Sequence, residues 1–269
     1  MEIINVYIDK EIVKVDNDNG TAYQFSKIYI EKLEKQGYLE EDDLVNFGFE
    51  IFNNIFSTSL RREKINNSFE KLSNHTNLII SISSEFEEIH NIPFEIINND
   101  GKDTGFLLKK GNISIIRDIP SLSKSVKPVQ APIRILILIS LPLEIYKTSP
   151  FDPLRELDII YSALNTYIEQ GIVEIDIEEK VSIRAIKERL SKKDYHIIHF
   201  TGHGTRGGNL IIEDENDSSK EKSISADEIQ DIFKGSNAQL FYFNACETAQ
   251  STEIEPSLAY HIYKFIPKA

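Results

Sequence analysis

Residues 133–140 read IRILILIS, a nearly continuous run of apolar, mostly β-branched side chains. A strand without polar alternation is typical of a parallel sheet that is covered on both faces. We expect further strands at 172–177, 195–200, 209–214 and 238–244. We expect helices between and after them at 153–170, 182–193, 225–235 and 255–265, with Ser225 and Glu228 as a capping box. This alternation predicts an α/β fold with right-handed crossovers.

The first part of the chain has a different pattern. The expected elements are two strands within 1–16, helices at 21–36 and 42–73, a strand at 77–83 and a hairpin over 106–119 that turns at Lys110-Gly111. Residues 121–132 are rich in Pro, Ser and Lys and predict a linker. The sequence therefore predicts an N-terminal half at 1–120 and a second half at 133–269.

Composition excludes several classes of protein. The 269-residue chain has a formal net charge of −13 and contains no basic stripe with interleaved aromatic residues, so neither nucleic acid nor a membrane surface is expected as a partner. The longest apolar run is too short to span a bilayer, and the N-terminus lacks the pattern of a signal peptide. A single cysteine excludes an internal disulfide framework, which favours a reducing, cytoplasmic location.

Two reactive side chains follow two of the expected strands. Residues 195–204 (YHIIHFTGHG) carry His203, and residues 240–249 (LFYFNACETA) carry Cys246, the only cysteine. The carboxyl ends of parallel strands meet at one edge of a sheet, where functional groups gather. We therefore expect the two side chains to lie close together.

A Cys-His pair suits nucleophilic catalysis. The imidazole of His203 would activate the thiol of Cys246 and protonate the leaving amine. The backbone N–H groups of Gly204 and Cys246 would serve as the oxyanion hole. The alternative is a buried structural cysteine and a histidine that ends a strand, and the residue types alone leave this open.

Two other chemistries fit less well, and no cofactor or metal is expected. His196, His199 and His203 have the spacing H-x2-H-x3-H, but a strand points the first two to opposite faces, so a zinc site is a weak alternative. The segment GHGTRGG resembles a phosphate-binding loop. Such a loop opens into a helix, whereas here a strand is expected next.

The motifs YHIIHFTGHG, NLIIED, SADEI and FNACETA, in this order, resemble the CHAT-domain family of caspase-like cysteine peptidases, which is related to separase, gingipain and caspases. IRILILISLP and LDIIYSAL resemble the first strand and helix of the family's catalytic half. FEEIHNIPFEII and ISIIRDI resemble a pattern of its N-terminal half, with Phe94 in place of the commoner Trp, so the resemblance covers roughly 40–269.

The resemblance implies a fold, an activity and site residues. The fold is a caspase-like parallel or mixed sheet flanked by helices, with an α/β accessory half that supports or regulates it. His203 and Cys246 match the catalytic pair, with Gly204 and Cys246 supplying the oxyanion donors. Asn244 matches a position that often lines the first specificity pocket, although it equally suits a strand-end Asn that satisfies backbone groups.

The implied function is a regulated cysteine endopeptidase that acts on a protein substrate, with an activating partner, in bacterial defence or signalling. The family pattern continues with two more strands after SLAYHIYKFIPKA, so we expect these strands to be absent from the chain. The chain would then be a fragment, a truncated form, or one member of a two-chain assembly in which a second chain supplies the strands. The alternative is a caspase-like interaction or scaffold module without catalysis.

Overall fold

The computed structural model describes residues 1–72, 76–120, 128–148, 152–205 and 208–245. The chain divides into two compact units, Met1–Ser123 and Lys124–Ala269, which are described separately below. No helix in the described ranges is both long enough and apolar enough to cross a bilayer.

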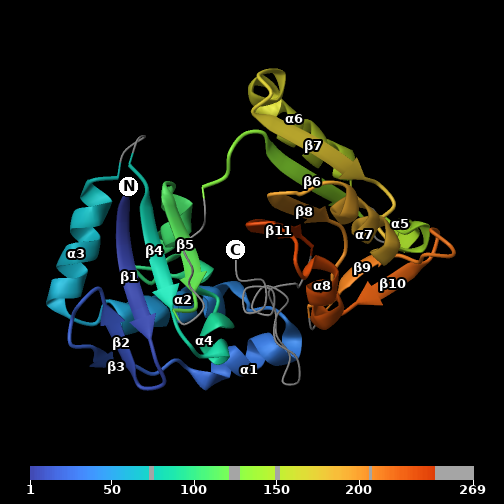
Figure 1. The fold of residues 1–269 in the computed structure, drawn as a ribbon. Helices are drawn as coiled ribbons and strands as arrows, with labels where there is room; N and C mark the ends of the chain where they lie inside the picture. The colour runs from blue at the N-terminus through green and yellow to red at the C-terminus, as the bar shows by residue number, and fades with distance from the viewer. Residues whose placement is uncertain (73–75, 121–127, 149–151, 206–207, 246–269) are drawn as a thin grey trace. The chain divides into compact units, whose positions relative to one another are not determined.

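The first unit is built on a mixed five-stranded sheet in the order β3-β2-β1-β4-β5 (Figure 1). Its strands are β1 (Glu2–Ile8), β2 (Ile12–Val15), β3 (Thr21–Ala22), β4 (Leu78–Ser83) and β5 (Ile113–Asp118). β2 pairs antiparallel with β1 and β3, whereas β4 pairs parallel with both β1 and β5.

The prediction of a hairpin over residues 106–119 is wrong. Residues Leu107–Lys110 form a short 3-10 helix, η3, whose Leu107 is fully buried, and Gly111 ends it with a φ of 72°. The backbone then enters β5, where Ile113 lies opposite Leu78 of β4. Because Leu107 is buried in the core, residues 107–110 lie outside the sheet and do not form a strand. β5 therefore pairs with β4 and not with the residues before Gly111.

The helices of this unit also differ from the expected ranges. They are α1 (Lys27–Gln36), α2 (Glu41–Ile55) and α3 (Ser59–Glu70), followed by the short α4 (Glu87–His90), η1 (Phe94–Ile96) and η2 (Asp103–Gly105). The single helix expected at 42–73 is broken because Thr58 caps a new helix, its hydroxyl accepting a hydrogen bond from the Arg61 N–H. The helix expected from residue 21 begins only at Lys27, since Thr21–Ala22 belong to β3.

Among its described residues, the first unit buries one charged side chain in its core, Arg61, which is only 2% exposed. Its guanidinium donates to the carboxylate of Asp18 (2.5 and 3.0 Å), to the carbonyls of Val13 and Ile55 (2.8 and 2.9 Å) and to the Thr21 hydroxyl (2.8 Å). The hydrogen bond from Arg61 lowers the pKa of Asp18. The network fixes the β2–β3 turn onto the junction of α2 and α3.

The second unit contains a four-stranded sheet, all parallel, in the order β11-β8-β6-β7 (Figure 1). Its strands are β6 (Ile133–Ile139), β7 (Val173–Glu178), β8 (Ile197–Thr201) and β11 (Leu240–Asn244). The helices are α5 (Leu143–Thr148), α6 (Pro153–Glu169), α7 (Ile183–Lys192) and α8 (Ala226–Phe233), and β9 (Leu210–Glu213) pairs with β10 (Glu221–Ile224) as an antiparallel hairpin. The predicted α/β fold class is confirmed; the helix expected at 255–265 lies outside the described residues.

β6 supplies buried side chains to both faces of this sheet. Leu136 and Leu138 pack with side chains of α7, α8 and the β9–β10 hairpin, whereas Ile135, Ile137 and Ile139 pack toward Leu157 of α6. The capping box of Ser225 and Glu228 is present at the start of α8, as expected. The sheet is therefore organised around its first strand in sequence, with the later strands on either side.

The Arg61 network predicts a large stability difference between two adjacent arginines. Arg61→Lys keeps the charge but cannot reach all the acceptors, so it should lower the free energy of unfolding by about 3 kcal/mol in urea titrations followed by circular dichroism. Arg62→Lys, at an exposed site that hydrogen-bonds Asn53, should change it by less than about 0.5 kcal/mol. Similar losses in the two variants would contradict a structural role for the network.

Candidate functional site

β8 and β11 are adjacent parallel strands, with Thr201 opposite Asn244 at their carboxyl ends. His203 follows the last residue of β8 by two positions, and Cys246 follows the last residue of β11 by two positions. Cys246 itself lies outside the described residues. The sheet therefore brings together the two strands that precede the predicted catalytic residues, and of the pair it places His203.

The segment around His203 is held by backbone hydrogen bonds on two sides. The Gly202 N–H donates to the Asn244 carbonyl (3.2 Å), and the His203 carbonyl accepts from the Ile211 N–H (2.9 Å). A Cβ on Gly202 would lie 2.9 Å from the Phe200 ring and 3.0 Å from the Ser140 carbonyl, so the close approach requires glycine. The path of the chain at His203 is thus fixed by both β11 and β9.

Gly204 forms an antiparallel bridge with Leu210. The hydrogen bonds of this bridge are made by the flanking residues, from the Ile211 N–H to the His203 carbonyl and from the Thr205 N–H to the Asn209 carbonyl, each 2.9 Å. Gly204 is therefore in a non-hydrogen-bonded pair of the ladder, and its N–H is not used there.

A polar cluster at the same edge is centred on Glu156 of α6. One carboxylate oxygen, Oε2, accepts from the Thr201 hydroxyl (2.6 Å) and from Asn244 Nδ2 (2.8 Å), and the other, Oε1, lies 3.0 Å from His199 Nε2. The ring of Tyr242 stacks on His199 with centroids 4.7 Å apart. The Asn244 side chain thus contacts a side chain on α6, and Glu156 connects the last residues of β8 and β11.

Glu156 and His199 differ in charge at neutral pH. Burial opposes ionisation of Glu156, but the hydrogen bonds from Thr201 and Asn244, together with His199, outweigh it and lower the pKa of Glu156. Burial lowers the pKa of His199 below its usual value, against the smaller attraction of Glu156. The cluster therefore consists of one carboxylate held by neutral donors.

A second carboxyl group at this edge, Glu213 of β9, is only 4% exposed. Its Oε2 accepts from the Ser140 hydroxyl and its Oε1 from the Leu141 N–H, both at 2.8 Å. Burial raises the pKa of Glu213 in spite of these bonds. Glu213 ties the end of β6 to the hairpin that follows the His203 segment.

Sequence reasoning missed both glutamates. Glu156 lies next to Leu157 and four residues before Ile160, which pack toward the sheet, so a charged residue on the sheet-facing side of an amphipathic helix was the available signal. Glu213 ends the apolar run LIIE, in which all four residues are buried. Neither glutamate belongs to a short motif with an assigned chemistry.

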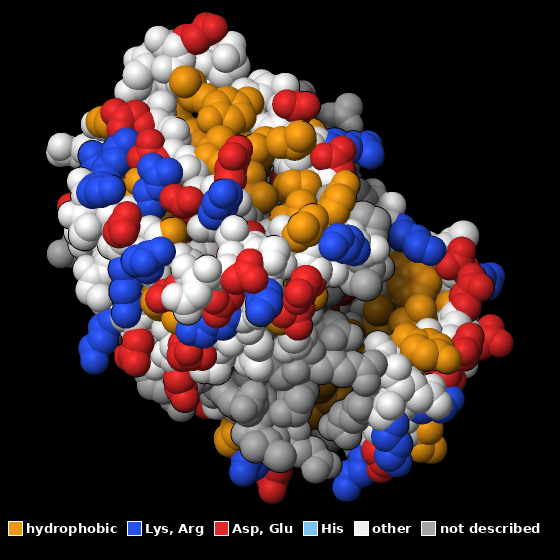
Figure 2. Space-filling view, turned by 90° about the vertical axis from the view of Figure 1, so that its right-hand side faces the viewer, with side chains coloured by type: hydrophobic (Ala, Val, Ile, Leu, Met, Phe, Trp, Pro, Cys, Tyr) orange, Lys and Arg blue, Asp and Glu red, His pale blue; other side chains and the backbone are white. Residues whose placement is uncertain are grey.

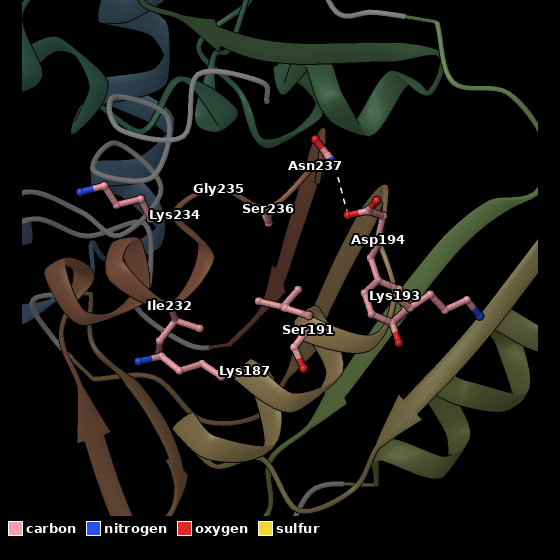
Figure 3. Close-up of a pocket in the computed structure, with 11 residues that line it drawn as sticks. Lys187, Ser191, Lys193, Asp194, Ile232, Lys234, Gly235, Ser236 and Asn237 are labelled. Atoms are coloured by element: carbon pink, nitrogen blue, oxygen red, sulfur yellow. Dashed lines mark hydrogen bonds between the residues drawn. The ribbon is translucent and has the colours of Figure 1, made fainter.

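A cavity of about 240 Å³ lies at the opposite edge of the sheet (Figure 3). It is lined by α7, by the residues that precede β8 and by the loop between α8 and β11, where Asn237 donates to Asp194 (3.1 Å). The cavity therefore lies at the amino ends of β8 and β11, whereas His203 follows the carboxyl end of β8. A second cavity, of about 340 Å³, lies in the first unit between Leu44, Ile96 and Phe106. Neither cavity contains a predicted site residue.

Apolar side chains are exposed on α6 and β11, the elements that carry Glu156 and Asn244. Leu240 and Tyr242 of β11 are each 52% exposed, and Leu154 and Ile159 of α6 are 63% and 62% exposed. Figure 2 shows hydrophobic side chains gathered in the upper half of the face turned to the viewer. Within the described ranges, no group of three or more His, Cys, Asp or Glu side chains is arranged to hold a metal ion.

Comparison with known proteins gives one family match. The family model described as CHAT domain matches residues 48–265, which include parts of both units. No curated protein matches the chain. The match covers the His203 and Cys246 motifs as well as the region around Phe94.

The two glutamates predict opposite pH dependence of stability. Because the folded-state pKa of Glu213 is raised, the folded protein retains a proton that the unfolded chain loses, so this contribution to stability is lost as the pH rises from 4.5 through the folded pKa. The folded-state pKa of Glu156 is lowered, so its contribution is present above 4.5 and is lost as the pH falls through the folded pKa.

Urea titrations between about pH 3 and about pH 8 should therefore show two opposite trends. The stability difference between the protein and Glu213→Gln should decrease as the pH rises, whereas the difference between the protein and Glu156→Gln should increase. Parallel curves for the two variants would show that the environments of the two carboxyl groups are not as described.

Proposed function

The chain belongs to the CHAT-domain family, which is related to caspase-like cysteine peptidases, and we propose on this basis that it is a cysteine endopeptidase acting on a protein substrate through Cys246 and His203. The observation that carries the proposal is the parallel pairing of β8 with β11, in which Thr201 lies opposite Asn244. Each strand is followed, at the same distance along the chain, by one member of the pair.

In the proposed reaction, the His203 imidazole accepts the proton of the Cys246 thiol, and the thiolate attacks the carbonyl carbon of the peptide bond. Negative charge then develops on the carbonyl oxygen. The backbone N–H of Gly204 takes no part in the hydrogen bonds of the bridge to Leu210. Together with the N–H of Cys246 it would form the oxyanion hole.

The tetrahedral intermediate collapses when the His203 imidazolium donates its proton to the leaving amine, and the first product departs. The acyl-enzyme is then hydrolysed by a water that His203 deprotonates, which regenerates the thiol. Both steps need His203 to keep its position. The hydrogen bond from the Ile211 N–H to the His203 carbonyl and the tether of Gly202 to β11 support this role.

The finer assignments belong to the same proposal. We propose that the enzyme is cytoplasmic, is switched on by a partner in bacterial defence or signalling, and pairs with a second chain along the outer edge of β11. These assignments rest on the family membership and on the open outer edge of β11 in the described sheet. A free strand edge suits pairing with an added strand.

The proposal predicts a reactive Cys246. A peptidyl fluoromethyl ketone should label Cys246 at pH 7 faster than it labels free cysteine, whose thiol pKa is about 8.5, because His203 favours the thiolate. His203→Ala should slow this labelling by about 100-fold or more and abolish cleavage. The measurement is the labelling rate by mass spectrometry, with Cys246→Ala as the blank.

The matched control is His196→Gln. His196 precedes β8 at its other end, where its ring accepts from the Arg134 N–H (3.0 Å), so its loss should leave the labelling rate unchanged. Labelling that requires unfolding and does not depend on His203 would instead identify Cys246 as a buried structural residue and favour the scaffold alternative.

A further inference from the structure

Glu213 is a buried carboxyl group at the end of an otherwise apolar strand. It is 4% exposed, and the three residues before it in β9, Leu210, Ile211 and Ile212, are buried as well. Burial raises the pKa of Glu213, so the site disfavours its charge. An apolar side chain would fill this position without that penalty. The polar contacts of the carboxyl group are therefore what distinguishes Glu213 from an apolar residue here.

These contacts join segments that are far apart in the sequence. Oε2 of Glu213 accepts from the Ser140 hydroxyl and Oε1 accepts from the Leu141 N–H, both at 2.8 Å. The backbone N–H of Glu213 donates to the carbonyl of Val181, just before α7, at 2.9 Å. The end of β9 is thus bound to the end of β6 and to the start of α7.

The end of β6 contacts the residues that lead to His203. The N–H of Ser140, which is fully buried, donates to the Thr201 carbonyl (3.0 Å). The carbonyl of Ser140 lies so close to Gly202 that a Cβ on this glycine would be 3.0 Å from it. The two residues before His203 are therefore packed directly against Ser140, one of the two residues that Glu213 binds.

β9 holds the same segment from His203 onward. The Ile211 N–H donates to the His203 carbonyl (2.9 Å), and Gly204 forms the bridge with Leu210. Glu213 follows Ile211 by two residues in the same strand. The residues before His203 are thus in contact with β6, the residues from His203 onward are in contact with β9, and the Glu213 carboxyl group joins β6 to β9.

This link does not depend on the segment that it supports. β9 pairs with β10 and is not a strand of the parallel sheet. Its backbone hydrogen bond toward the end of β8 goes to His203 itself. The carboxyl group of Glu213 instead fixes β9 to β6, the central strand of the fold. Because a shift of about 1 Å at a reacting group can slow a reaction by about 100-fold, such a link affects proton transfer by His203.

We propose that Glu213 is a positioning residue for the proposed reaction: by holding β9 against the end of β6, it keeps His203 where the imidazole exchanges a proton with Cys246. This inference rests on the proposed peptidase function and adds a residue to the same site. Glu213 acts through His203 and does not contact the reacting atoms.

The test is a double-mutant cycle on the rate at which iodoacetamide labels Cys246 at pH 7. Glu213→Leu removes both acceptor oxygens but keeps a side chain of similar bulk. It should slow labelling by about ten-fold or more. In the His203→Ala background the same substitution should change the rate by less than about two-fold, because the imidazole through which Glu213 acts is gone.

Two variants separate positioning from loss of stability. Glu213→Gln keeps an acceptor for the Leu141 N–H and offers an N–H to the Ser140 hydroxyl, so its labelling rate should stay within about three-fold of that of the unmodified chain. Ser225→Ala removes the N-cap of α8 in the same unit and should leave the rate unchanged although it destabilises the fold. Urea titrations followed by circular dichroism measure the stability of each variant.

A milder variant serves if Glu213→Leu does not fold. Ser140→Ala removes one of the two donors to Glu213 and leaves the other, so it should slow labelling by about three-fold. In the His203→Ala background it should have no effect, as in the first cycle.

The outcomes distinguish the two proposals. If the effects of Glu213→Leu and His203→Ala multiply, or if the folded Glu213→Leu variant is labelled at the unmodified rate, Glu213 is merely structural: the positioning inference is overturned and the peptidase proposal stands. The Ser140→Ala cycle is judged in the same way. If His203→Ala alone leaves the labelling rate unchanged, the peptidase proposal fails and the inference fails with it.

Discussion

The burial of β6 on both faces is the constraint on which the second unit depends. A strand whose successive side chains are nearly all apolar cannot lie at a sheet surface, so it needs layers of structure on either side. Those layers are helices that connect parallel strands, and parallel strands end at one edge of the sheet. The side chains that follow β8 and β11 are brought to one edge by this requirement of packing.

Glu156 shows how that edge is specialised. Backbone hydrogen bonds hold the parallel strands β8 and β11 together as far as Thr201 and Asn244. The carboxylate of Glu156 continues the link by side-chain hydrogen bonds to the same two residues. Since α6 also packs its Leu157 against Ile135 and Ile137, the position of Glu156 is set by the apolar contacts one residue away.

The strands of the parallel sheet and β9 could be predicted from the sequence because each carries a run or an alternation of apolar residues bounded by turn residues or a helix start. β10 was not predicted, because its residues, EKSI, are mostly polar. The local signals were weaker in the first unit. Lys110-Gly111 has the composition of a hairpin turn, yet burial of Leu107 in the core directs the preceding residues into a 3-10 helix. The apolar pattern over 42–73 continues through the break at Phe56, and only the capping by Thr58 marks the start of a second helix.

The candidate site was predictable in part for a related reason. His203 and Cys246 stand out because a reactive residue at the end of an apolar strand is conspicuous in the sequence, and Asn244 stands out by its spacing from Cys246. Glu156 precedes Asn244 by 88 residues, and its partners come from two different strands. Only the sheet order β11-β8-β6 brings these segments together, and helical periodicity indicates merely that Glu156 is close to the sheet-facing side.

Burial and hydrogen bonding act on both glutamates at this edge, but their net effects on the two pKa values are opposite. Both are partly or wholly withdrawn from water and both accept hydrogen bonds, but burial dominates for Glu213 and the donated hydrogen bonds dominate for Glu156. Glu213 is enclosed by Ser140, Leu141 and its own strand, so a charge there has no solvent or ligand to interact with. Glu156 stays ionised and accessible beside the end of β11. Of the two, only Glu156 combines a persistent charge with exposure to solvent, whereas Glu213 serves to hold β6 against β9.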